Sequence, residues 1–146
     1  MKRTSTRMRL CTALLICNLI FIWGNSLLPG EVSGAFSDWV KGILQALFAQ
    51  GTESPSSGGL LRKLAHFTEF AGLGILLCWR FSMMGKSWKT AFLWGAAAAC
   101  ADETIQMFVP DRGPAIRDVC IDSAGVLTGI ALLLLGHTYL KKRRSA

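Results

Sequence analysis

The chain has 146 residues, of which 51% are hydrophobic and only 17% are charged, and its formal net charge is +7. A soluble domain usually carries about 25% charged residues. The composition therefore argues against an ordinary soluble domain. A soluble helical bundle is a poor alternative, because the long apolar runs are apolar around most of the helix rather than along one stripe.

Four long apolar runs cover residues 8–28, 60–84, 88–108 and 118–140. Each is close to the roughly 20 residues that a helix needs to cross the hydrocarbon core of a bilayer. We therefore predict an all-α, polytopic membrane protein with four transmembrane helices, which form a single domain over residues 1–146.

Basic residues gather before the first run, after the last run, and around the turn between the second and third runs. In a four-span topology these segments share one side of the membrane, which the positive-inside rule assigns to the cytoplasm. We predict a plasma-membrane protein with both termini cytoplasmic, and we attribute the positive charge to topology rather than to nucleic-acid binding. The basic residues concerned are Lys2, Arg3, Arg7, Arg9, Arg80, Lys86, Lys89, Lys141, Lys142, Arg143 and Arg144.

The first run has two interpretations. Small residues at 33–35 offer a cleavage site for a secretory signal, but they lie far beyond the apolar core, which continues to Leu28. We therefore predict a retained helix after a basic tail at residues 1–9. At its outer end, Asn25 and Ser26 either hydrogen-bond to neighbouring helices or meet the lipid headgroups.

A turn at residues 30–34 leads to an amphipathic pattern over residues 36–50, with apolar side chains at spacings of three and four. This segment is too short and one-sided to span. We predict a short interfacial helix in the outer leaflet, and a lid packed on the bundle fits the same pattern. Residues 51–59 are rich in glycine and serine and are predicted to form a flexible loop.

Polar residues that a bilayer disfavours occur near the outer ends of the last three runs. A carboxylate at the centre of a membrane helix costs roughly 2.5–3.5 kcal/mol, so these side chains should face one another. We expect Lys63 and Arg112 to be the counter-charges of the acidic pair Asp102 and Glu103. The predicted binding residues are Lys63, His66, Glu69, Asp102, Glu103, Gln106, Arg112, Asp118 and Asp122.

Together these residues would form an outward-facing polar pocket, which has two interpretations. It is either a ligand site or a network of ion pairs that fixes the register of the helices. Acid–base chemistry would use His66 or Glu103. The sequence holds no nucleophile motif or phosphate loop, so we lean against an enzyme. The spacing of the five cysteines and two histidines suggests neither a disulfide framework nor a metal site, and we expect no cofactor.

Three sequence blocks between residues 60 and 130 resemble the VanZ-like family of small integral membrane proteins. They are Lys63-Leu-Ala-His66-Phe67 ahead of Gly72 and Gly74, Asp102-Glu103-Thr-Ile-Gln106 followed by Pro110 and Arg112, and Asp118-Val-Cys-Ile-Asp122 followed by Gly125 and Gly129. The chain departs from the family pattern at two positions. Asp122 stands where the family usually has Asn, and Asp111 stands where a Gly commonly precedes the loop arginine.

The resemblance implies a four-helix protein of the bacterial plasma membrane and a link to resistance against the glycopeptide antibiotic teicoplanin. We predict a cell-envelope protein that engages membrane lipids, with a lipid-linked cell-wall precursor or a glycopeptide as further candidate partners. The alternative is a membrane-embedded enzyme on a lipid-linked substrate, with His66 or Glu103 as acid or base. The sequence leaves the oligomeric state open. A transporter is a weaker hypothesis, because the four spans show no internal inverted repeat and transport would need a dimer.

Overall fold

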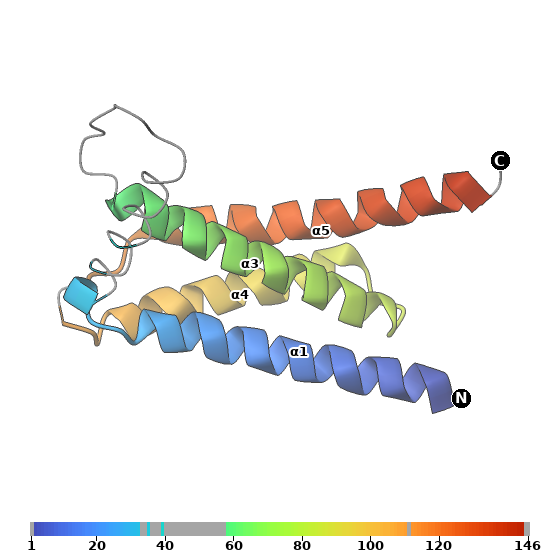
Figure 1. The fold of residues 1–146 in the computed structure, drawn as a ribbon, viewed down its shortest axis with the longest axis horizontal. Coiled ribbons are helices and arrows are strands. Elements are labelled where there is room, and N and C mark those ends of the chain that lie inside the picture. The colour runs from blue at the N-terminus through green and yellow to red at the C-terminus, as the bar shows by residue number, and fades with distance from the viewer. Residues whose placement is uncertain (1, 33–34, 36–38, 40–57, 111, 145–146) are drawn as a thin grey trace.

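The structure is a computed structural model, and it describes residues 2–32, 35, 39, 58–110 and 112–144 (Figure 1). All regular structure in these residues is α-helical. Four long helices dominate: α1 (Lys2–Ser26), α3 (Gly58–Ser82), α4 (Trp88–Gln106) and α5 (Ile116–Arg144). The four apolar runs predicted from the sequence therefore all form helices.

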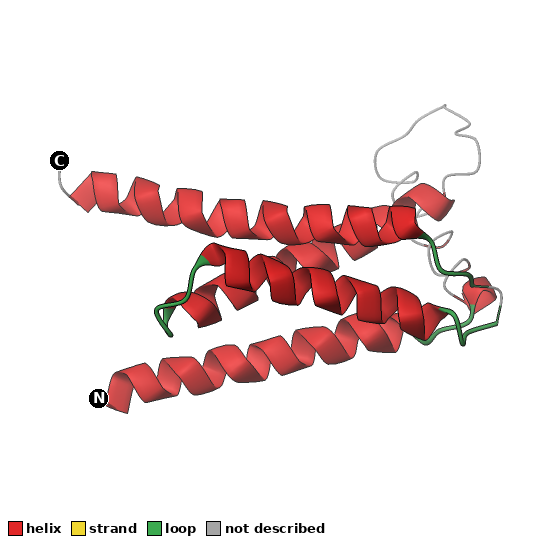
Figure 2. Cartoon of the chain, turned by 180° about the vertical axis from the view of Figure 1, so that it is seen from behind, coloured by secondary structure: helices red, strands yellow, loops and turns green. Residues whose placement is uncertain are grey.

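The four helices run side by side in alternating directions (Figure 1). Both ends of the described chain lie at one end of the bundle together with the short turn between α3 and α4, and the loop between α4 and α5 lies at the other end (Figure 2). Helices α3 and α4 each pack on the other three long helices, and the most extensive contact in the bundle is between α3 and α5.

The helix boundaries correct several predicted limits. Helix α1 begins at Lys2, so the basic tail is helical, since residues 2–23 contain no glycine or proline to interrupt a helix. The turn after α1 lies at residues 27–29, and residues 30–32 are helical rather than part of a turn. Pro29 precedes them, and its fixed φ suits the start of a helix.

The other boundaries shift by a few residues. Helix α3 begins at Gly58, inside the predicted loop, and α5 begins at Ile116, two residues before Asp118. Proline restricts the residue before it, here Gly113, to extended conformations, so α5 starts only after Pro114. The predicted amphipathic segment 36–50 and most of loop 51–59 lie outside the described residues. Trp39 is described there, and it is helical and exposed.

Small residues let α5 approach α3 closely. A Cβ atom added at Gly125 would meet the carbonyl oxygen of Phe67, and one added at Gly129 would meet the carbonyl oxygen of Ala71. From the other side, a Cβ atom at Gly74 would meet the backbone of Val126. This glycine-based contact is the packing mode by which membrane helices gain van der Waals contact.

Apolar side chains cover both the core and the outside of the bundle. The buried core draws on all four helices, with Ile22, Phe70, Leu73, Ala99 and Val126 among its members. Large apolar side chains also stay exposed along α1, α4 and α5, among them Ile20, Phe21, Leu93, Trp94, Leu132 and Leu135. So much exposed apolar surface is unusual for a soluble monomer and typical of a lipid-facing surface.

Two of the described helices are long and apolar enough to cross a membrane by length and composition, Ser5–Ser26 within α1 and Ile116–Arg143 within α5. Helices α3 and α4 carry most of the buried polar residues. Those residues lower the hydropathy of both helices, because a charged or amide side chain offsets several apolar neighbours.

Candidate functional site

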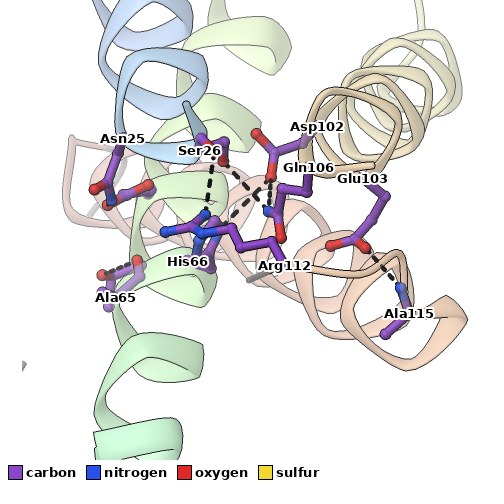
Figure 3. A network of polar contacts seen from close by, with 11 residues as sticks. Asn25, Ser26, Ala65, His66, Asp102, Glu103, Gln106, Arg112 and Ala115 are labelled. Carbon is purple, nitrogen blue, oxygen red and sulfur yellow. Dashed lines mark hydrogen bonds and ion pairs between the residues drawn. The ribbon is translucent and has the colours of Figure 1, made fainter. Parts of the chain in front are cut away.

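The buried polar side chains gather at one end of the bundle, where α1 and α4 end and α3 and α5 begin. Figure 3 shows the contacts among several of them. We call these side chains, together with the half-buried Arg112, the polar cluster, which consists of Ser26, His66, Asp102, Glu103, Gln106, Arg112 and Asp122.

Asp102 is completely buried at the centre of the polar cluster. Gln106, one helical turn later on α4, donates a hydrogen bond of 2.8 Å from Nε2 to its Oδ2. His66 of α3 points its Nδ1 toward the same oxygen at 3.8 Å, which is an ion-pair distance if the imidazole is protonated. The other oxygen, Oδ1, is buried and has no hydrogen-bond partner among the described residues.

Glu103 faces a different direction, toward the start of α5. Its Oε2 accepts a hydrogen bond of 2.8 Å from the backbone N–H of Ala115. Ala115 immediately precedes α5, and its carbonyl oxygen accepts the first hydrogen bonds of that helix, from Asp118 and Val119. Glu103, a residue of α4, therefore caps the N-terminal end of α5, where the helix dipole favours negative charge.

Three hydrogen bonds tie the end of α1 to the rest of the bundle, two of them within the polar cluster. Gln106 donates from Nε2 to Ser26 Oγ at 3.4 Å, and Arg112 donates from Nη1 to the Ser26 carbonyl oxygen at 3.3 Å. Asn25 donates from Nδ2 to Glu69 Oε1 of α3 at 3.1 Å. Of the two interpretations of Asn25 and Ser26, the structure thus supports contact with neighbouring helices.

Arg112 lies in the loop between α4 and α5 and is half-buried. Its Nε and Nη2 are buried without a hydrogen-bond partner among the described residues. Burial lowers the pKa of the guanidinium from its ordinary value, and the neighbouring charge of Arg62 lowers it further. The charges of Asp102 and Glu103 act in the opposite direction and raise that pKa, so Arg112 lies within electrostatic reach of both.

A small cavity opens beside the polar cluster between α3, α4 and α5. It has a volume of about 10 Å³ and is lined by Arg62, Lys63, His66, Glu103, Gln106, Asp118, Ile121 and Asp122. That volume is close to the minimum that holds one water molecule. In this conformation the cavity therefore has room for a water molecule or an ion but not for a whole headgroup.

The pairing of charges differs from the one expected. Lys63 lies 3.8 Å from Asp118 Oδ1, and both side chains are about one-third exposed, so this is a pair at the rim. The acidic pair instead accepts hydrogen bonds, Asp102 from the Gln106 side chain and Glu103 from the Ala115 N–H. Arg112 donates to the Ser26 carbonyl oxygen and interacts with the acidic pair electrostatically. Side-chain amide and backbone donors stabilise a buried carboxylate without burying a second charge, which avoids a further desolvation cost.

The other predicted binding residues lie near the start of α3, the end of α4, the α4–α5 loop and the start of α5. Glu69 lies to one side, bonded to Asn25. Sequence reasoning missed Arg62, which lines the cavity; its only signal is its position beside Lys63 at the start of α3. Ile121 was also missed, since it is one of many apolar residues in that stretch.

Comparison with known proteins gives one finding on the family. The family model described as VanZ/LLP1 matches residues 10–137, which includes all four long helices in whole or in large part. No curated protein and no solved structure matches the chain.

Proposed function

The chain belongs to the VanZ/LLP1 family. From that membership and the polar cluster, we propose that it is a multi-pass protein of the bacterial plasma membrane that acts at the cell envelope. In this proposal α1, α3, α4 and α5 all cross the bilayer, and the polar cluster opens outward toward the headgroups of lipids or lipid-linked cell-wall precursors. A contribution to glycopeptide resistance of the teicoplanin type follows as the cellular outcome to examine.

Helix length and charge distribution support the four-span topology. The shortest of the four helices, α4, has 19 residues, and at about 1.5 Å per residue it approaches the roughly 30 Å hydrocarbon thickness. Exposed basic residues lie at the end that carries both termini and the α3–α4 turn, which the positive-inside rule places in the cytoplasm. They are Arg7, Arg9, Lys86, Lys89, Lys141, Lys142 and Arg143.

The polar cluster lies at the opposite end of the bundle, which this topology turns outward. Ionisable residues at membrane depth usually serve function, because a purely structural contact rarely compensates for their desolvation. Since the cavity is no larger than a water molecule or an ion, the headgroup would bind at its rim. Lys63 and Arg62, both partly exposed there, would hold an anionic phosphate that competes with Asp118 for Lys63.

One observation favours an enzyme as the second candidate, the approach of His66 Nδ1 to the buried Asp102. A carboxylate close to one ring nitrogen of an imidazole orients the ring and makes the imidazole a stronger general base. Glu103 is the weaker candidate for a general base, because one of its oxygens already caps α5. The enzyme would act on a lipid-linked substrate bound at the same rim.

The experiment is rescue of a deletion strain, scored by glycopeptide susceptibility and by the profile of envelope lipids and precursors. We expect Lys63→Ala, His66→Ala and Glu103→Ala to rescue poorly at equal membrane abundance. The matched control is Lys89→Ala, which removes an exposed lysine at the other end of the bundle. If all three variants rescue as well as wild type, the polar cluster has only a structural role and the proposal fails.

Glu103→Gln separates the two candidate functions. An enzyme that uses this carboxylate as a base should lose turnover while it still binds its substrate. A binding protein should show a graded loss of affinity instead, since the amide oxygen can still accept the Ala115 hydrogen bond.

A further inference from the structure

Three chemically reactive side chains from three helices converge inside the polar cluster. His66 of α3, Asp102 of α4 and Asp122 of α5 each offer one nitrogen or oxygen atom, and these atoms all lie within 4.8 Å of one another. All three residues are buried, with exposed fractions of 8%, 0% and 1%. No spacing in the sequence reveals this set, because its members are far apart along the chain.

The carboxylate oxygens of this set have too few donors. Asp102 Oδ1 and both oxygens of Asp122 are buried without a hydrogen-bond partner among the described residues. Buried polar groups are almost always satisfied, and a carboxylate that is not satisfied loses its full solvation. Asp122 also lines the cavity, whose volume of about 10 Å³ fits a single small ion.

From this geometry we propose that His66, Asp102 and Asp122 bind one divalent transition-metal ion, Zn²⁺ or Mn²⁺, at the junction of α3, α4 and α5. A mixed set of one imidazole and two carboxylates suits these ions, since imidazole favours zinc and carboxylates favour manganese. Water in the cavity would complete the coordination, as it does in open zinc sites.

The distances allow coordination with small movements. Metal–nitrogen and metal–oxygen bonds measure about 2.0–2.2 Å, so two ligand atoms on one ion lie at most about 4.4 Å apart. The 3.8 Å between His66 Nδ1 and Asp102 Oδ2 already meets this limit. Any pair nearer to 4.8 Å needs a shift of a few tenths of an ångström, which a side-chain rotation supplies.

The surroundings of the triad support an ion. Gln106 donates to Asp102 Oδ2, and an outer hydrogen bond of this kind orients a ligating carboxylate, while Oδ1 has no donor among the described residues. The nearby cations do not neutralise the pair of aspartates by contact, because Lys63 pairs with Asp118 and Arg112 donates to a backbone carbonyl. One divalent ion would balance both carboxylates.

The test uses the full chain purified in detergent and dialysed against Mn²⁺ or Zn²⁺, followed by elemental analysis of the protein fraction. We expect about one ion per chain in the wild type. We expect at least a tenfold weaker apparent affinity in His66→Ala and in Asp122→Asn. Asp122→Asn keeps the shape of the side chain and breaks no observed hydrogen bond, so it should fold, which gel filtration checks.

The matched control is His137→Ala, which removes the only other histidine, an exposed one near the opposite end of α5. It should retain the metal. Gln106→Leu should weaken binding by about 10–100-fold, as loss of a hydrogen bond to a ligating group does. In addition, the spectrum of bound Co²⁺ or the paramagnetic resonance signal of bound Mn²⁺ should change in His66→Ala.

Three results would overturn the inference: a wild type without stoichiometric metal, full retention in His66→Ala or Asp122→Asn, or equal loss in His137→Ala. The first result would mean that the two aspartates share a proton and a water molecule instead. Metal content is measured without any lipid or susceptibility assay, so this site can fail while the proposed function stands, and the reverse.

Discussion

The substitution Gly129→Ala tests the contact that brings α5 against α3. The added methyl group would meet the carbonyl oxygen and carbon of Ala71 and the amide nitrogen of Ile75, all of which belong to the α3 backbone. Backbone atoms cannot rotate away, so α5 must move outward. Such overpacking typically costs about 1–3 kcal/mol, and we expect the upper end because the contact is with backbone.

The control is Gly136→Ala on the same helix, where an added Cβ has nothing within 4 Å. Both variants gain the same helix propensity, about 1 kcal/mol, so the difference between them isolates the packing term. We expect the free energies of unfolding to differ by about 3 kcal/mol, with Gly129→Ala less stable. On the scale of proteins of this size, this corresponds to roughly 6–12 °C in Tm.

Thermal unfolding in detergent can be followed by a thiol-reactive dye, since Cys11 and Cys78 are buried and become reactive when the bundle opens. Equal midpoints for Gly129→Ala and Gly136→Ala would refute the reasoning. That result would mean that the two helices are not in backbone contact at Gly129.

Further predictions concern the polar cluster and the topology. Gln106→Leu removes the donor to Asp102 and should lower the free energy of unfolding by about 1–3 kcal/mol in the same dye assay, whereas an unchanged midpoint would mean that water replaces the amide. Lys63→Ala breaks a partly exposed ion pair and should change it by less than about 1 kcal/mol, so that a larger loss contradicts its position at the rim. In a cysteine-free background, Ser87→Cys should react with a membrane-impermeant maleimide only from the cytoplasmic side and Pro114→Cys only from outside. Labelling of both from one side would exclude the four-span topology.

The helices could be predicted from the sequence because each apolar run is long and bounded by charged, glycine or proline residues. The residues at which they begin and end could not, since helix ends depend on which groups cap them, including groups on other helices. Helix α5 begins at Ile116 because the Ala115 N–H finds Glu103 on another helix. Helix α1 extends to Lys2 because nothing in the basic tail stops it.

All members of the polar cluster except Ser26 were among the residues predicted from the sequence, but their pairing was not. Alternating helix directions bring the start of α3, the end of α4 and the start of α5 to one level, which is enough to collect His66, Asp102 and Asp122. Charge alone then suggested Lys63 and Arg112 as partners of the acidic pair. The sequence could not show that Gln106 and a backbone N–H are the donors to those carboxylates, because such contacts depend on helix rotation.

The close approach of α5 to α3 also determines the geometry of the polar cluster. Gly125 packs against the carbonyl oxygen of Phe67, the residue after His66. Asp122 lies three residues before Gly125, on the same face of α5. Gly125→Ala should therefore move Asp122 away from His66 and lower metal retention, while Gly136→Ala leaves it unchanged. Full retention in Gly125→Ala, with α5 measurably destabilised against α3, would show that the ligand distances do not depend on this contact.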